Sequence, residues 1–271
     1  PLGKNFFVEG TYRYNYKKTD SDKETYSRDA AGNYNILDER YTTNYDNTFV
    51  TQQAELNFMK QEEKYNITIG ASMQPSYTKS VGEGRDTSYT VTNFSPAARI
   101  DYRFSDDKFL RVRYRGRTSQ PSINQLMPVN DNSDPLKQTV GNPNLDPEFT
   151  HSLSTEYRSN NRRNFSFFSA SADFSFTQND IVAKKYYTEE GVQISTYENA
   201  DKNVYSASGR IMVNTPIAKS NFSVNSFTMV RYNNSYSYVR DAGDWTENET
   251  SNLNISQMLR FTYTLFTELI F

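Results

Sequence analysis

Hydrophobic and polar residues alternate along much of this chain with a period of two. Residues 6 to 16 show the pattern strictly, with one side made by Phe6, Val8, Gly10, Tyr12, Tyr14 and Tyr16. Successive side chains of a β-strand point to opposite faces, so this period predicts strands rather than helices. The pattern recurs near residues 50–58, 65–77, 94–104, 110–117, 149–157, 168–176, 205–213, 222–232 and 253–271. The sequence therefore predicts about ten amphipathic strands.

Two kinds of connection alternate between these segments. Short charged or polar turns occur at residues 60–64, 105–108 and 160–163 and near Pro216. Long polar stretches occur at residues 19–46, 78–92, 119–146, 178–203 (hairpin-like) and 233–252. This order is typical of a transmembrane barrel with short periplasmic turns and long external loops. We therefore predict an all-β fold, an antiparallel transmembrane β-barrel that occupies residues 1–271.

The composition supports this prediction. The mean hydropathy is −0.83, and only 35% of the residues are hydrophobic. Yet the chain has 21 Tyr and 18 Phe, whereas disordered chains are poor in aromatic residues. No apolar run reaches the length of about 18 residues that a transmembrane helix requires. A soluble all-β protein also alternates, but the opposite faces here are polar over many successive strands, which favours the membrane.

Charge and residue types exclude several functions. The formal net charge is −2, which gives no reason to expect a nucleic-acid partner. The chain has no Cys and a single histidine, His151, and no catalytic triad, phosphate loop or zinc spacing is visible. We predict no enzyme activity, no cofactor and no metal site. The oxygen-rich run at residues 130–134 lacks the EF-hand spacing and is interpreted as an ordinary turn-rich loop.

A row of arginines is the strongest local feature. They share the inward face of one predicted hairpin, at positions Arg99, Arg103, Arg111, Arg113, Arg115 and Arg117. Facing a lumen, they would form a basic stripe that attracts an anionic ligand. The alternative, which we favour, is that they pair with a plug domain or with the inward carboxylates of Glu55, Asp101, Glu156 and Asp173.

A loop motif carries a family resemblance. After Arg117, the chain continues with Thr-Ser-Gln-Pro-Ser-Ile-Asn-Gln-Leu, and later contains Gly141, Asn142, Pro143, Asn144, Leu145, Asp146, Pro147 and Glu148. This segment resembles the barrels of TonB-dependent outer-membrane receptors, and the Tyr- and Asn-rich style resembles those of Bacteroidetes. In that family the segment closes an external loop and opens the next strand. Its prolines favour extended or turn conformations in the residues before them, so its role is structural.

The resemblance implies energised nutrient uptake across the bacterial outer membrane. Such receptors have 22 strands and an N-terminal plug that couples to TonB, and neither the plug nor the remaining strands is visible here, so we expect a receptor fragment. Outer-membrane lipid is the expected surrounding, and some relatives also bind a surface lipoprotein. Loop Tyr and Asn residues suit heme, siderophore, peptide and glycan ligands alike.

Two alternatives to the receptor stay open. The terminal Phe271 resembles an outer-membrane assembly signal, which would fit a complete small barrel acting as a pore, adhesin or barrel enzyme. The other alternative is a soluble all-β surface protein that binds glycans through its Tyr-rich loops.

Overall fold

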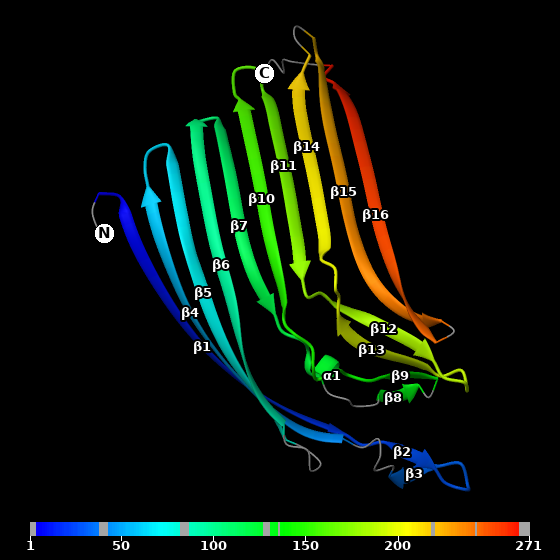
Figure 1. Ribbon diagram of the computed structural model, residues 1–271. Helices are drawn as coiled ribbons and strands as arrows, with labels where there is room; N and C mark the ends of the chain where they lie inside the picture. The colour runs from blue at the N-terminus through cyan, green and yellow to red at the C-terminus, as the bar shows by residue number, and fades with distance from the viewer. Residues whose placement is uncertain are drawn as a thin grey trace.

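Ten long strands form one curved sheet in the computed structural model, which describes residues 4–37, 43–81, 87–126, 131–134, 136–217, 220–241 and 243–265. These strands pair antiparallel in chain order, each with the next (Figure 1). They are β1 (Phe6–Lys23), β4 (Thr43–Gln61), β5 (Tyr65–Val81), β6 (Thr87–Ser105), β7 (Lys108–Ser119), β10 (Glu148–Asn161), β11 (Ser166–Gln178), β14 (Val204–Pro216), β15 (Phe222–Asp241) and β16 (Asp244–Tyr263). The strands predicted from the alternation are confirmed.

The connections at one end of the sheet contain shorter elements. They are β2 (Tyr26–Arg28), β3 (Tyr34–Leu37), the single turn of helix α1 (Ile123–Leu126), β8 (Asp131–Asp134), β9 (Lys137–Thr139), β12 (Ile181–Tyr187) and β13 (Gln193–Asn199). Strands β12 and β13 form the predicted hairpin; β12 pairs in parallel with β15, and β13 with β9. We call β8, β9, β12 and β13 the outer platform. Among the described residues, no helix has the length and hydrophobicity to cross a membrane.

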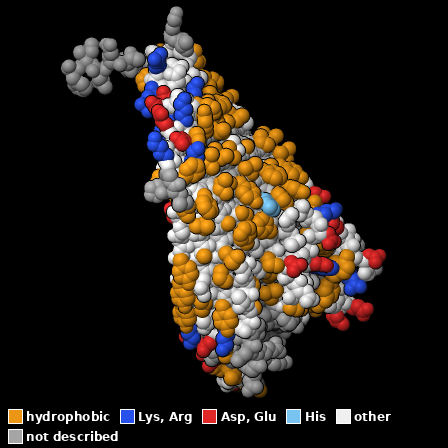
Figure 2. All heavy atoms as spheres, turned by 60° about the vertical axis from the view of Figure 1, so that its left-hand side comes forward, with side chains coloured by type: hydrophobic (Ala, Val, Ile, Leu, Met, Phe, Trp, Pro, Cys, Tyr) orange, Lys and Arg blue, Asp and Glu red, His pale blue; other side chains and the backbone are white. Residues whose placement is uncertain are grey.

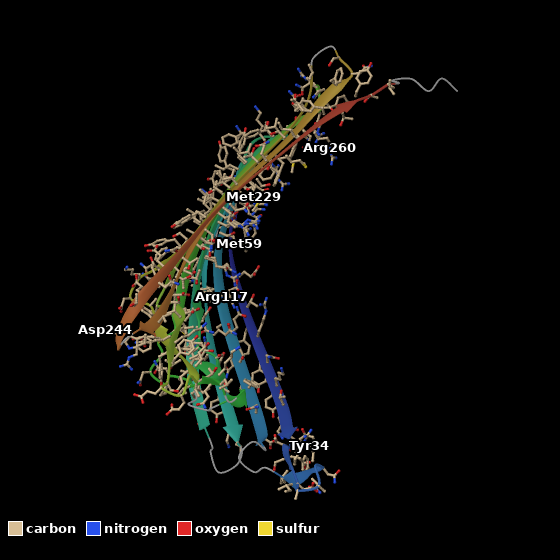
Figure 3. The ribbon with its side chains drawn as sticks, turned by 90° about the vertical axis from the view of Figure 1, so that its right-hand side faces the viewer. Tyr34, Met59, Arg117, Met229, Asp244 and Arg260 are labelled. Carbon is tan, nitrogen blue, oxygen red and sulfur yellow. The ribbon has the colours of Figure 1, made fainter. Side chains whose placement is uncertain are left out.

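The sheet is a single layer with one apolar and one polar face. Figure 2 shows hydrophobic side chains covering a broad area of one side, and Figure 3 shows the sheet as an arc with Arg260, from the polar face, on its inner side. Among the described residues, the buried hydrophobic side chains are only Leu145, Val182 and Ala200. Residues of the apolar face such as Ile255 are instead 66% exposed. This face has no protein layer over it and therefore suits lipid as its solvent.

Two of the predicted loops are mostly strand. Residues 78–92 were expected to form a loop, but β5 continues to Val81 and β6 begins at Thr87. Residues 233–252 were also expected to form a loop, but β15 and β16 pair as far as Asp241 and Asp244. These ends lie beyond the apolar band, where water reaches both faces of a hairpin. Polar side chains then occupy both alternating positions, and the backbone pairing leaves no hydropathy signal.

The sheet is open in the region that the structure describes. Its order begins at β1 and proceeds strand by strand to β15, which pairs β16 on its other side. The long strands β1 and β16 therefore form the two edges. Phe271 and the end of the last predicted strand lie outside the described residues.

Candidate functional site

The arginine row lies on the polar face, as predicted. In the β6–β7 hairpin, Arg99 is opposite Arg113, and Asp101 is opposite Arg111. The row continues along β7 through Arg115 and Arg117, at every second position. Arg103 follows on β6, opposite Phe109.

Carboxylates neutralise Arg99 and Arg111, whereas Arg103, closer to the β6–β7 turn, makes no ion pair within the described residues. Asp101 accepts hydrogen bonds from Nε of Arg99 at 2.6 Å and from Nε of Arg111 at 2.5 Å. Glu156 on β10 lies 3.7 Å from Nη1 of Arg111 and 2.5 Å from Nη2 of Arg158. Arg99, Arg111 and Arg158 thus form a chain of ion pairs with the two carboxylates that the pairing interpretation named, Asp101 and Glu156.

The other end of the row carries unpaired charge. Arg113, Arg115 and Arg117 are exposed and have no carboxylate partner within the described residues. Of the other two expected carboxylates, Glu55 accepts a hydrogen bond from Asn57, and Asp173 pairs with Arg210 instead. The pairing prediction therefore holds for only part of the row.

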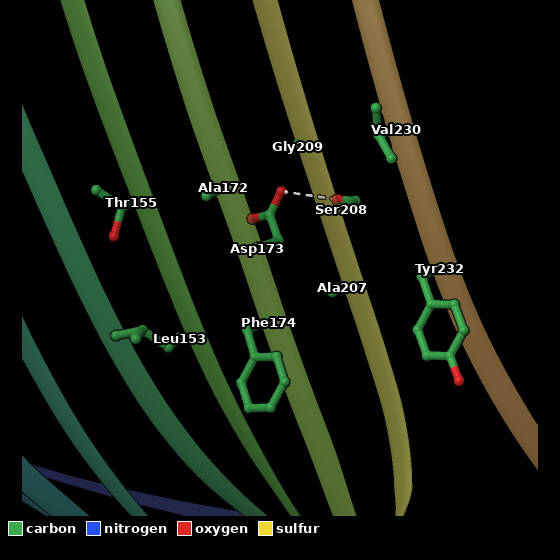
Figure 4. A pocket seen from close by; sticks show the side chains of 10 residues that line it. All are labelled: Leu153, Thr155, Ala172, Asp173, Phe174, Ala207, Ser208, Gly209, Val230 and Tyr232. Atoms are coloured by element: carbon green, nitrogen blue, oxygen red, sulfur yellow. Dashed lines mark hydrogen bonds between the residues drawn. The ribbon is translucent and has the colours of Figure 1, made fainter. Parts of the chain in front are cut away.

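Sequence reasoning missed further arginines of this face, and two of them form ion pairs. Arg210 Nη2 lies 3.1 Å from Oδ2 of Asp173. The same oxygen accepts a hydrogen bond from Oγ of Ser208 at 3.3 Å (Figure 4). Arg158 is the second, paired with Glu156. The signal was available, because both alternate with outward residues such as Tyr157 and Ile211.

The loop motif joins the β7–β10 connection to the connection between β11 and β14. Asn142 Nδ2 donates to the carbonyl of Tyr197 on β13, and its Oδ1 accepts from the backbone of Asn144. Asn199 Oδ1 accepts from the backbone N–H of Asp146, and its Nδ2 donates to the carbonyl oxygens of Asp146 and Asn179. These bonds hold the motif at Asn142, Asn144 and Asp146. A structural role for the whole motif, Gly141, Asn142, Pro143, Asn144, Leu145, Pro147 and Glu148, stays a prediction.

The last residue of the motif joins β10 to β12. Glu148 Oε1 accepts a hydrogen bond from the backbone N–H of Ile181 at 2.9 Å. Burial, and next the negative charge of Glu148, raise the pKa of the neighbouring Asp180 above its usual value of 3.8. Two carboxylates thus share the junction between the sheet and the outer platform.

The outer platform also contacts the β15–β16 hairpin through side chains. Lys184 Nζ lies 4.3 Å from the ring centroid of Trp245 and forms an ion pair with Glu198. In the connection from β13 to β14, Lys202 Nζ lies 2.6 Å from Oε1 of Glu247. These contacts, with the β12–β15 pairing, attach the β12–β13 hairpin to the β15–β16 hairpin as an extension of the sheet.

His151 lies on the apolar face. Its Nδ1 and the hydroxyl of Tyr114 are 2.9 Å apart, and its ring stacks on Phe176 at 4.5 Å between centroids. The ring of Phe149 lies edge-on at 4.7 Å. His151 lies near the start of β10, among aromatic rings. In the oxygen-rich run at residues 130–134, residue 130 lies outside the described residues, and Asp131–Asp134 form strand β8.

A single-layer antiparallel meander with one lipid-facing and one polar face defines the class of outer-membrane β-barrels. Residues 1–271 match the outer membrane protein beta-barrel family, and the chain belongs to this family. It is a protein of the bacterial outer membrane. This location excludes the soluble glycan-binding alternative.

Two solved structures are similar to this chain. One is titled copper transporter OprC, at 11% identity and a TM-score of 0.60, with 86% of this chain and 39% of that chain covered. The other is the siderophore receptor PirA from Pseudomonas aeruginosa, at 14% identity and a TM-score of 0.43, with 98% and 63% covered. The chain spans less than two thirds of either structure, and the OprC likeness shows the fold alone. The search of curated proteins gave no match.

Proposed function

We propose that this chain is the barrel portion of a TonB-dependent outer-membrane receptor that takes up a nutrient ligand. The observation that carries the proposal is the polar inner face, which bears exposed Arg113, Arg115 and Arg117 above a neutralised row of ion pairs. A wall of this kind suits an aqueous lumen through which a ligand passes. The sheet's likeness to a structure titled copper transporter supports the transport class.

The two open edges support a larger barrel. Strands β1 and β16 are 18 and 20 residues long, and edge strands of that length need partners in a bilayer because no water satisfies their backbone groups. In our proposal, further strands complete a barrel of 22 strands, and a plug domain absent from this chain couples it to TonB. A surface lipoprotein is a further proposed partner, and we propose no catalytic role.

The test is the complete reading frame that encodes residues 1–271. The proposal predicts a plug-like domain with a TonB-contacting segment before the barrel, and more alternating strands to close it. Cells that carry the complete gene should lose the growth advantage it confers when the TonB homologue is deleted. A frame that encodes only these ten strands after a signal peptide would replace the receptor with a small barrel that acts as a pore or adhesin.

A further inference from the structure

A hollow on the polar face combines unpaired arginines with a floor of serines. It encloses about 380 Å³, within the size range of small-molecule pockets. Its polar lining comes from β7, β10, β11 and β14 and consists of Arg113, Arg115, Ser152, Ser154, Asp173, Ser175, Ser206 and Ser208.

The strand register arranges this lining in two parallel rows. One row runs across the sheet through Arg115, Ser152, Ser175 and Ser206. The next runs through Arg113, Ser154, Asp173 and Ser208. Neighbouring strands lie about 4.8 Å apart, so each row spans roughly 14 Å. The short side chains on β10, β11 and β14 form the floor of the hollow, and the arginines of β7 form one wall.

The charge of this hollow is positive. Its single carboxylate, Asp173, is already held by Arg210 at 3.1 Å and by the hydroxyl of Ser208 at 3.3 Å. Arg113 and Arg115 make no ion pair within the described residues, and they are neighbours on one strand face. Two adjacent cations with no partner repel each other, and a bound anion would relieve this repulsion.

On the far side of the floor, a third arginine continues the pattern. Arg231 on β15 is opposite Ser208, and Asn233 is opposite Ser206. Arg231 is also exposed and makes no ion pair in the described part of the chain. The serine floor is therefore bounded by cationic side chains on both flanks.

We propose that this hollow, which we call the serine basin, is a binding subsite for a small ligand that carries carboxylate or phosphate groups. Guanidinium groups bind such oxyanions through paired N–H donors, and the serine hydroxyls add neutral donors and acceptors for hydroxyl groups of the same ligand. The basin lies toward the platform end of the strands, since Ser152 is near the start of β10 at Glu148. This assignment rests on the proposed receptor function, because it requires the inner face to line an aqueous lumen.

The test measures binding of citrate and of inorganic phosphate to the purified full-length protein by titration calorimetry at low salt. The double variant Arg113→Gln/Arg115→Gln should weaken binding about tenfold or more, because both guanidinium groups that donate to the charged oxygens of the ligand are removed. The matched control is Arg13→Gln/Arg260→Gln, which removes two exposed inner-face arginines outside both the arginine row and the basin. It should bind within about twofold of the wild type. Binding of citrate but not phosphate would identify a carboxylate ligand, and the reverse a phosphorylated one.

A second variant does not depend on removing arginines. Ser175→Asp places a carboxylate on the floor, opposite Ser152 and Ser206, and should abolish binding of both anions. Equal binding by the wild type, the double variant and Ser175→Asp would overturn the proposal. So would a wild type that binds neither anion while the double variant unfolds more easily, because the arginines would then serve an acidic segment of the protein itself.

This binding assay is independent of energised uptake. If the protein binds anions but its growth advantage survives deletion of the TonB homologue, the receptor proposal is refuted and the assignment of the basin stands. Loss of anion binding with normal TonB-dependent growth would refute the basin alone.

Discussion

Arginine at an outward position of β5 should destabilise the protein, whereas arginine at an inward position should not. The outward residues of β5 run from Tyr65 to Tyr77, and Ile69 lies near the middle of this series. Its side chain is 59% exposed, so little protein packing is lost on substitution. The cost of Ile69→Arg is therefore mainly that of placing a charge in hydrocarbon, about 2–4 kcal/mol near the bilayer midplane.

The inward control is Ser72→Arg. Ser72 is opposite Glu55 on β4, so the new guanidinium meets a carboxylate and an aqueous lumen. Arginine at Thr68 should also be tolerated, but Thr68 is opposite Arg99, which makes Ser72 the cleaner comparison. Ile69→Leu controls for the loss of the isoleucine shape.

The assay is urea titration of the full-length protein in phospholipid vesicles, with the folded fraction measured by heat-modifiable gel mobility. A cost of 2–4 kcal/mol corresponds to about 30-fold to 900-fold in the folding equilibrium for Ile69→Arg. Ser72→Arg and Ile69→Leu should stay close to the wild type. Equal destabilisation by the two arginine variants would refute the assignment of the two faces.

Three further predictions address other parts of the chain. Gly116→Ala should lower the free energy of unfolding by about 1–3 kcal/mol in the same urea assay, because the added Cβ would lie 2.7 Å from the Phe149 ring and 2.8 Å from Pro96. Gly209→Ala, which has open space around the added Cβ, should leave the free energy of unfolding unchanged. Equal effects of the two would contradict the packing at β7. Asn199→Ala should speed proteolysis of the β12–β13 hairpin without lowering barrel assembly, because it removes the hydrogen bonds to Asp146 and Asn179. An unchanged rate of cleavage would show that these hydrogen bonds do not hold the hairpin in place. Burial and Glu148 raise the pKa of Asp180, so the stability that protonated Asp180 contributes is present below its usual pKa of 3.8 and is lost as pH rises through the raised pKa. The hydrogen-exchange protection of β12 should therefore fall across this pH window in the wild type and stay constant in Asp180→Asn. A flat pH profile in the wild type would refute this prediction.

The alternation predicted the strands well because one face of each must meet lipid. Segments such as residues 65–77 have one acceptable orientation, so their side-chain pattern specifies both the strand and its faces. The hairpin ends beyond the bilayer were missed because water wets both of their faces. The parallel pairing of β12 with β15 joins segments distant in sequence and has no local signal.

The candidate site was predicted in part for the same reason. Arg113 and Arg115 share the inward phase of β7, which the sequence shows directly. Which arginines keep a carboxylate depends on the register between strands: Glu156 lies opposite Arg111, whereas Asp173 lies two strands from Arg113 with Ser154 between them. Such cross-strand neighbours become visible only when the sheet is assembled.

The most direct test of the account is the accessibility of nitroxide labels along β11 of the full-length protein in lipid vesicles. The chain has no native cysteine, so single cysteines label cleanly. Labels at Phe168, Ala170, Ala172 and Phe174 should collide mainly with oxygen dissolved in lipid, and labels at Ser169, Ser171, Asp173 and Ser175 should not. An alternation with period two in this phase is the predicted result. A uniform profile, or the opposite phase, would contradict the central claim that the apolar face meets lipid and the arginine-bearing face lines the lumen.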